Sequence, residues 1–300
     1  MAEVLAYLAT LEGSDPALHA SISTALGAIE SALHIFPGVE LCLSFNGGKD
    51  STVVLHLLRC VLHRRGLSYA TTLEACPRIV YFSASGRDLA PCRGAAPPSQ
   101  PPPPLHPATF PEICAFMQAS EAAYGFAIEE LQGFKAGLAS LVRAPGGCVR
   151  GVLMGTRQGD PDAAQLRGPF SPTSLSWPPA MRVCPILDWP YAHVWAFLRG
   201  VGLPYCCLYD AGYTSLGSPE DSAPNPTLLR GGGLAPLPAW HLQDGALERE
   251  GRAKRRHGLG SASSSGGGSS EGGAGAAAAG STSAAAGSAA GSAAGSSSCS

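Results

Sequence analysis

Hydrophobic positions in the first third of the chain follow two different spacings, which predict two helices separated by a strand. Between Asp15-Pro16, where a helix can be capped, and Pro37-Gly38, apolar residues recur every three or four positions, as on one helix face. The run VELCLSF at residues 39–45 is almost continuously apolar and predicts a buried strand. The helical spacing returns from Val53 to Val61 and predicts a second amphipathic helix that ends near Gly66.

The alternation of strand and helix patterns continues toward the middle of the chain. Strands are predicted at 78–82, 149–155 and 181–186, and helices at 111–124, at 131–142 and after a cap at Asp188-Trp189-Pro190. Strands that alternate with helices are typical of an α/β protein with a doubly wound, mainly parallel sheet. In such a fold, ligands bind at the carboxyl ends of the strands.

Composition divides the chain unevenly. Residues 260–300 are almost entirely Ser, Gly and Ala and have little to bury, so we expect a disordered tail. Residues 84–108 are rich in proline and lack periodicity, which predicts an insertion in extended polyproline form. The rest of residues 1–259 is long enough for one α/β domain.

Charge and the N-terminal composition argue against several classes of protein. A formal net charge of −2 provides no basic surface for nucleic acids or anionic membranes. Acidic residues precede the first arginine, Arg59, which argues against a transit or signal peptide, and the apolar run near it is too short to cross a bilayer. We expect a soluble cytoplasmic protein, with an organelle not excluded, and the sequence identifies no protein partner.

Cysteine usage favours free thiols over disulfides or a zinc site. The ten cysteines include no CxxC pair. Several lie in apolar runs, where Cys packs as a small hydrophobic residue, and a reducing cytosol leaves it unpaired. These are Cys42, Cys60, Cys114, Cys148 and Cys184.

The stretch SFNGGKDS at Ser44–Ser51 lies between a predicted strand and a predicted helix, where a phosphate can bind. Glycines let the backbone approach oxygen atoms, and the N-terminal amides of a helix favour negative charge. It is not a P-loop, because Leu43 stands in place of a glycine and Asp50 in place of Ser or Thr. The simpler alternative is a glycine turn capped by Asp50 or Ser51. The pattern resembles the SGGxDS loop of ATP pyrophosphatases, which implies cleavage between the α- and β-phosphates of ATP.

Further blocks extend the resemblance over residues 40–229. VLMGTRQGDP, PFSPTSLSWPPAMR, PILDWPYAHVWAFLR, PYCCLYDAGYTSLGS and PNPTLL follow the glycine loop in the order and spacing of eukaryotic FAD synthases. This family has the adenine nucleotide α-hydrolase-like fold of phosphoadenylylsulfate (PAPS) reductases. The resemblance implies transfer of AMP from ATP to the phosphate of FMN, giving FAD and pyrophosphate. It also implies Mg²⁺, which binds through few carboxylates and leaves little signature in a sequence, so its ligands stay unassigned.

The resemblance also implies roles for individual residues at the ATP phosphates. Lys49, as a point charge, and Asp50 are expected to be catalytic. Because the attacking group is already an anionic phosphate, positioning and charge neutralisation should matter more than a strong base. The expected ATP-binding positions are Ser44, Asn46, Gly47, Gly48, Ser51 and Arg157, with a surface ion pair as the alternative role of Arg157.

At the flavin, the resemblance implies roles for Asp160, Trp177 and Arg182. An indole can stack on isoalloxazine, and a guanidinium can bind its carbonyl or phosphate groups; core packing is the alternative for Trp177. Arg249 and Arg252 match a paired-arginine motif of the family and are expected to be catalytic. On a helix, their spacing would place both guanidiniums on one face, toward the pyrophosphate, although a solvated basic end is an equal alternative.

Three positions depart from the family pattern. Gln158 replaces a basic residue, Gly159 replaces a threonine, and Ser174 replaces an acidic residue three positions before the tryptophan. These departures leave open a catalytically silent flavin- or nucleotide-binding protein. A PAPS reductase-like enzyme is a further alternative, but Cys299 lacks the neighbours that its reactive cysteine would need. We do not expect this chain to include the molybdopterin-binding-like domain that animal homologues carry.

Overall fold

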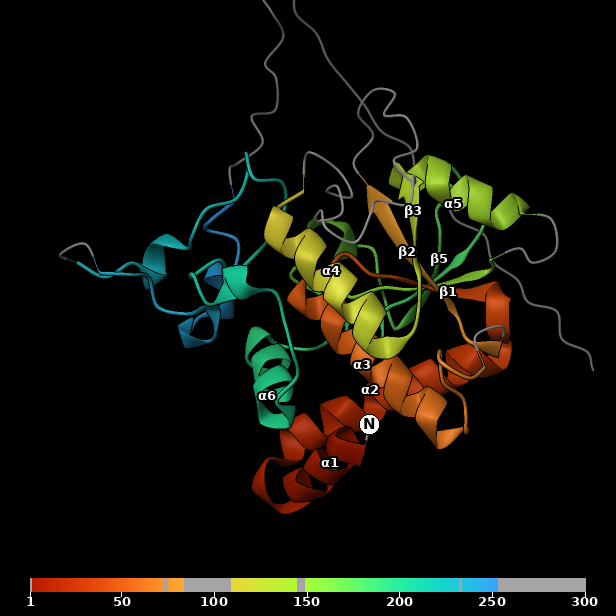
Figure 1. Cartoon of the computed structure of the whole chain (residues 1–300), viewed down its shortest axis with the longest axis horizontal. Coiled ribbons are helices and arrows are strands. Elements are labelled where there is room, and N and C mark those ends of the chain that lie inside the picture. The colour runs from red at the N-terminus through yellow and green to blue at the C-terminus, as the bar shows by residue number, and fades with distance from the viewer. Residues whose placement is uncertain (1, 73–74, 84–108, 145–148, 232–233, 253–300) are drawn as a thin grey trace, which may run out of the picture. The chain divides into compact units, whose positions relative to one another are not determined.

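The structure is a computed structural model of the chain and describes residues 2–72, 75–83, 109–144, 149–231 and 234–252 (Figure 1). The predicted proline-rich insertion and the predicted tail lie outside the described residues, as do Cys148 and Cys299. The predictions for these segments are therefore not tested by the structure.

Helices and strands alternate along most of the described chain. In order, the elements are α1 (Ala2–Ser14), α2 (Pro16–Ile35), β1 (Leu41–Ser44), α3 (Lys49–Arg64), β2 (Arg78–Ser83), α4 (Pro111–Tyr124), β3 (Ile128–Gln132), α5 (Phe134–Arg143), β4 (Gly151–Leu153), β5 (Phe170–Pro172), β6 (Met181–Val183) and α6 (Tyr191–Val201). The segments described after α6 contain only short 3₁₀ turns as helical structure.

Within the described residues, the strands form one six-stranded sheet in the order β3-β2-β1-β4-β6-β5. All neighbouring pairs are parallel except β5 and β6, which run antiparallel. The predicted doubly wound, mainly parallel sheet is confirmed. The strand order reverses between β1 and β4, and at such a switch point the loops that follow the two strands diverge and leave a crevice.

The two faces of the sheet are covered by different helices, because successive side chains of a strand point to opposite faces. On one face, Leu41 and Leu43 of β1 pack in the main core with α1–α4 and α6. On the other face, Cys42 belongs to a smaller core that includes Leu138 and Leu141 of α5. Figure 1 shows α5 across the sheet from α3 and α4.

Three details of the predicted elements are corrected by the structure. Residues 131 and 132 are not helical but end β3, which pairs with β2; Gly133, at φ +64°, then turns the chain into α5. The sequence patterns also gave no indication of α1 or β5. Asp188 does not cap α6, whose first flanking residue is Pro190 without a side-chain cap; its carboxylate accepts a hydrogen bond from Gln158 Nε2 at 2.9 Å.

The prediction of buried, unpaired thiols is confirmed for Cys42, Cys60, Cys114 and Cys184. Burial raises the pKa of the Cys42 thiol to about 12 and that of Cys184 to about 11. Among the described helices, none combines the length and hydropathy needed to cross a membrane.

The buried His56 makes stability depend on pH. It is 1% exposed in the middle of α3, its ring lies edge-on to Tyr124, and its Nδ1 is 3.2 Å from a guanidinium nitrogen of Arg59. Burial and the nearby Arg59 charge lower the pKa of His56 to about 3. In the unfolded chain a histidine titrates near 6.5, so the unfolded state takes up the proton first as the pH falls. The stabilising contribution is complete above about pH 6.5 and is lost progressively as the pH falls toward the folded-state pKa.

We therefore expect His56→Gln to reduce the loss of stability between pH 7.5 and pH 5 by about 2 kcal/mol relative to wild type. Urea unfolding of both proteins at the two pH values measures this difference. His63→Gln, exposed on the same helix, is the control and should keep the wild-type pH dependence. An unchanged dependence in His56→Gln would mean that His56 is not held neutral in the fold.

Candidate active site

The loop at Ser44–Ser51 joins the carboxyl end of β1 to the first turn of α3. Gly47 has φ +70°, a conformation that suits glycine. The side-chain oxygen of Asn46 accepts hydrogen bonds from Gly48 N at 3.0 Å and Ser51 Oγ at 2.8 Å, which folds the loop back on the helix. The simple capping alternative is not supported, since the residue before α3 is Gly48 and no side chain caps the helix.

A cavity of about 290 Å³ lies beside this loop, at the switch point of the sheet. Its walls come from the glycine loop, the end of β2, the start of α5 and the segment after β4, and from two segments later in the chain. The lining residues are Ser44, Asn46, Gly48, Lys49, Asp50, Ser51, Phe82, Phe134, Met154, Gly155, Thr156, Asp160, Tyr209, Ser215, Leu216, Glu248 and Arg249.

Four charged side chains form a closed ring of alternating sign at this cavity. Asp50 accepts from Lys49 Nζ at 3.0 Å and from Arg157 Nε at 2.7 Å. Glu248 contacts the same two cations, Lys49 through one carboxylate oxygen and Arg157 through the other. The side chains of Lys49 and Arg157 are only 2% and 7% exposed. Arg157 is thus not in the surface ion pair that was its alternative role.

The ring shifts the pKa values of Lys49, Arg157 and Asp50 in the directions that keep these three side chains charged. Burial alone would lower the pKa of Lys49 and of Arg157, but Asp50 and Glu248 outweigh it and raise both. Burial would raise the pKa of Asp50, but Lys49 and Arg157 lower it. The neighbouring Asp160 differs: burial and the charge of Asp50 raise its pKa, although its side chain accepts a hydrogen bond from Arg157 N at 2.9 Å.

Two buried polar residues hold Glu248 in place. Asn225, which is 0% exposed, donates from Nδ2 to Leu247 O at 2.8 Å and to Thr214 Oγ1 at 2.9 Å. Thr214, also 0% exposed, donates to Glu248 O at 2.6 Å. The backbone at 247–248, where the 3₁₀ turn Gly245–Leu247 ends, is therefore fixed by side-chain hydrogen bonds.

Gly155 sets how closely the chain after β4 approaches α3. A Cβ atom at this position would lie 2.6 Å from Ser51 N and 2.7 Å from Asp50 C. Both atoms belong to the backbone of the first turn of α3, and neither can rotate away. The glycine thereby allows Arg157, two residues later, to reach Asp50. Tyr209 supports the same turn, since its hydroxyl accepts from Lys49 N at 2.8 Å.

An aromatic wall adjoins the charged ring. Phe82 and Phe134 line the cavity and have ring centroids 4.3 Å apart. Trp177 lies edge-on to Phe134 at 5.7 Å and is 37% exposed. It is not a core residue, and it reaches the cavity only through Phe134. Arg182 on β6 does not line the cavity; it donates to Pro172 O at 3.2 Å across the β5–β6 pair.

The two arginines of the predicted pair do not share a helix face. The chain leaves the 3₁₀ turn Gly245–Leu247 without forming a longer helix. Arg249 lines the cavity and lies 3.8 Å from Asp160. Arg252 instead pairs with Asp221 at 3.0 Å, in a short bridge between Ser222 and Arg252. The prediction of a shared face was wrong, because it required a helix through Arg249 and Arg252. The chain forms no helix after Leu247 in the described part of this segment.

Most residues predicted at the ATP phosphates are brought together by the fold. Two of them, Gly47 and Arg157, do not line the cavity. Gly47 sets the shape of the loop through its positive φ, and Arg157 contacts Asp50, which does line the cavity. The sequence reasoning missed Glu248, Tyr209, Phe82 and Phe134. For Glu248, the only available signal was its position directly before Arg249.

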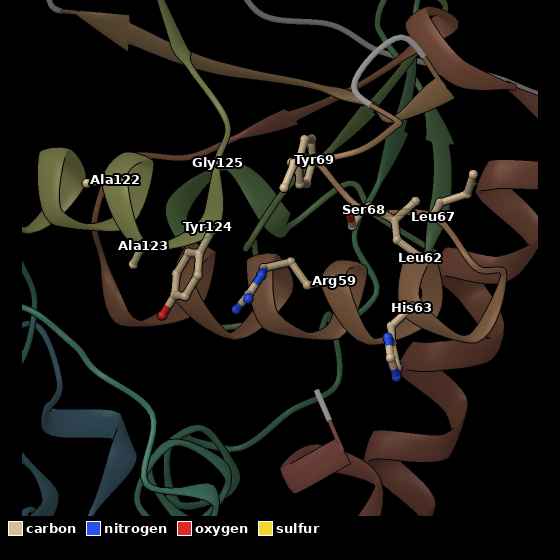
Figure 2. A pocket seen from close by; sticks show the side chains of 11 residues that line it. Arg59, Leu62, His63, Leu67, Ser68, Tyr69, Ala122, Ala123, Tyr124 and Gly125 are labelled. Carbon is tan, nitrogen blue, oxygen red and sulfur yellow. The ribbon is translucent and has the colours of Figure 1, made fainter.

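A second cavity, of about 380 Å³, lies between the second half of α3 and the end of α4 (Figure 2). The Arg59 guanidinium carbon is 3.5 Å from the centroid of the Tyr124 ring. Figure 2 shows Arg59, His63 and Tyr124 on the elements that surround it. No residue predicted to be functional lines this cavity. The cavity at the switch point is therefore the candidate active site.

Comparisons with known proteins agree with the fold. A family model for the phosphoadenosine phosphosulfate reductase domain matches residues 149–224. A probable FAD synthase of Schizosaccharomyces pombe is 32% identical over 232 residues, which are 77% of this chain and 78% of that protein. A probable FAD synthase of Caenorhabditis briggsae is 35% identical over 229 residues, 75% of this chain. The match covers 38% of that nematode protein, and a second match covers 40% of the probable FAD synthase of Caenorhabditis elegans, so the chain spans about two fifths of their length.

A solved structure has the same fold. The FMN adenylyltransferase of Candida glabrata, in complex with FAD and inorganic pyrophosphate, superposes with a TM-score of 0.68 at 22% identity. The superposition covers 83% of this chain and 95% of that one.

Proposed function

The chain belongs to the FAD synthase family, and we propose that it transfers AMP from ATP to the phosphate of FMN, releasing pyrophosphate. The observation that carries the proposal is the buried ring of Lys49, Asp50, Arg157 and Glu248 at the switch point of the sheet. It places two cations, held by carboxylates, beside the amides that begin α3. This combination suits the binding of a polyphosphate.

In this proposal, the protein contributes positioning and charge rather than a strong base. The phosphate of FMN is already an anion, so no proton needs to be removed before it attacks the α-phosphorus of ATP. Lys49, Arg157 and the loop amides would hold the β- and γ-phosphates and stabilise the charge that develops on pyrophosphate as it leaves. Arg249 faces the same cavity and would contribute to this stabilisation, whereas Arg252 would position the segment through Asp221.

The oxygen-rich walls also fit the expected Mg²⁺. Asp50, Asp160 and Glu248 line the cavity. No set of three or more potential metal ligands is grouped for a metal ion among the described residues. Mg²⁺ keeps waters and substrate phosphates as most of its ligands, and Asp160 would be a protein carboxylate that helps to hold it. When bound, Mg²⁺ would neutralise charge on the phosphate oxygens.

The flavin would bind at the aromatic wall. Trp177, exposed beside Phe134, offers an indole face or edge to isoalloxazine. Lys135 supplies positive charge at the same place, with Nζ 5.9 Å from the Trp177 ring centroid. Arg182 does not line the cavity, so its contact with the flavin stays a prediction. A cytoplasmic location also belongs to this proposal, on the argument that a reducing compartment keeps buried thiols free.

The proposal is tested by incubating the purified chain with FMN, ATP and Mg²⁺. FAD formation is followed by chromatography, and pyrophosphate release is measured in the same samples. We expect FAD and pyrophosphate to form in equal amounts. A folded chain that binds FMN or ATP without releasing pyrophosphate would instead be the silent binder suggested by Ser174 and Gln158.

The substitution Ser174→Asp tests whether the departure at this position weakens flavin binding. Ser174 is exposed in the turn that carries Trp177, and its hydroxyl lies 3.4 Å from that of Ser176. Hydrogen bonds to a charged group are stronger than those to a neutral one by about 1 kcal/mol. We therefore expect Ser174→Asp to lower the KM for FMN about fivefold, as measured by FAD formation at varied FMN. Ser176→Asp adds the same charge to the same turn and should leave the KM unchanged; equal effects would mean that charge in general, not position 174, is responsible.

A further inference from the structure

Glu248 bridges the two cations of the ring in the way that a phosphate group would. One oxygen of its carboxylate contacts Lys49 and the other contacts Arg157. Two oxygens of a phosphate could take the same two positions, because both cations bind phosphate and carboxylate oxygens alike. Glu248 also lines the cavity, with a side chain that is 13% exposed. The carboxylate and a bound phosphate therefore need the same donors.

The two carboxylates of the ring are anchored differently. Asp50 is the neighbour of Lys49 in the first turn of α3, so its short side chain extends from the regular backbone of a helix. Glu248 has a longer side chain on a segment without regular structure, and its backbone is fixed separately by Thr214 and Asn225. A change of rotamer can therefore release Glu248 from the cations while its backbone stays in place.

We propose that Glu248 competes with the polyphosphate for Lys49 and Arg157 and, by returning to both cations after the reaction, promotes the release of pyrophosphate. The naming of pyrophosphate as the product rests on the proposed function. With Glu248 in place, two cations face two carboxylates, and the ring has no net charge. With Glu248 turned away, the pair of cations is only half compensated and attracts a phosphate strongly. Glu248 thus weakens product binding at a site that would otherwise retain pyrophosphate.

The test is the affinity of the full chain for pyrophosphate, measured by titration calorimetry without ATP or FMN, once with Mg²⁺ and once without. We expect Glu248→Gln to bind pyrophosphate about tenfold more tightly than wild type in both conditions, because the amide keeps the size but lacks the competing charge. Glu250→Gln is the matched control, since it removes the same charge from an exposed position two residues away. The control should bind as wild type does.

Unchanged or weaker binding by Glu248→Gln, in either condition, overturns the proposal. If Glu248→Gln binds pyrophosphate more weakly only in the presence of Mg²⁺, then Glu248 holds the metal instead. If Glu250→Gln binds pyrophosphate as tightly as Glu248→Gln, then the effect comes from overall charge. If Glu248→Gln does not fold, Glu248→Asp decides, since the shorter carboxylate cannot span both cations; it should bind more tightly than wild type, and any other result counts against the proposal. The readout does not require FAD synthesis, so a chain that forms no FAD would disprove the proposed function without deciding the role of Glu248.

Discussion

Asp50→Asn is expected to reduce the rate of FAD formation by about 100-fold or more while changing the melting temperature little. The carboxylate of Asp50 accepts hydrogen bonds from both Lys49 and Arg157 and so fixes the distance between the two cations. An asparagine has one acceptor oxygen, and its NH₂ group would face a cation. Glu248 would still contact both cations, so the fold should survive. What is lost is the placement of positive charge at the phosphates.

The measurement is the rate of FAD formation with thermal unfolding of the same preparation. Asp210→Asn serves as the control, because Asp210 is exposed and accepts a hydrogen bond from the Tyr205 hydroxyl at 3.2 Å, away from the ring. It should retain wild-type activity. A near-normal rate for Asp50→Asn would show that the ring is structural, and a loss of stability as large as the loss of activity would lead to the same conclusion.

Gly155→Ala is expected to abolish most activity and, unlike Asp50→Asn, to destabilise the fold by about 2–3 kcal/mol. The added methyl group would lie 2.6 Å from Ser51 N, and contacts with backbone cannot be relieved by a rotamer change. Either the first turn of α3 or the end of β4 must shift. Any such shift separates Arg157 from Asp50, which are held at 2.7 Å in the wild type.

Urea unfolding and the FAD assay measure both effects. Gly159→Ala is a matched control in the same loop, because nothing lies within 4 Å of the Cβ that it would add. The control should fold and turn over as wild type does. If Gly155→Ala is as stable and active as Gly159→Ala, then the close approach of the two segments is not required for the site.

The fold and half of the site could be predicted because their signals are local. The apolar run at 39–45, the glycines after it and the helical spacing that follows all lie within one short stretch. Spacing also identified β2 and β4, whose side chains are buried on both faces of the sheet. By contrast, Ile128–Gln132 contains two glutamates and resembles the start of a helix. Only its pairing with β2 makes it a strand, and that contact is not visible in the local sequence.

Glu248 could not be predicted for a related reason. A glutamate in a polar stretch has no periodicity that distinguishes it, and its partners lie 91 and 199 residues away. The prediction that Arg249 and Arg252 share one face was wrong for the opposite reason. Their local spacing was clear, but the backbone does not form the helix on which that spacing would place them on one face. Family resemblance located the segment, and the fold alone decided which of its charges face the cavity.

The hydrogen bonds around Asn225 bear on the order in which the segments of a newly synthesised chain fold. The sheet can assemble once β6 has been synthesised, yet Lys49 must wait for a partner 199 residues farther along. Closing so large a loop is entropically unfavourable, and the hydrogen bonds that Asn225 makes with Thr214 and Leu247 help to hold it closed. A nascent chain is therefore expected to pass through a stage in which Asp50 alone compensates Lys49 and Arg157, and the last segment to dock is the one that completes the ring.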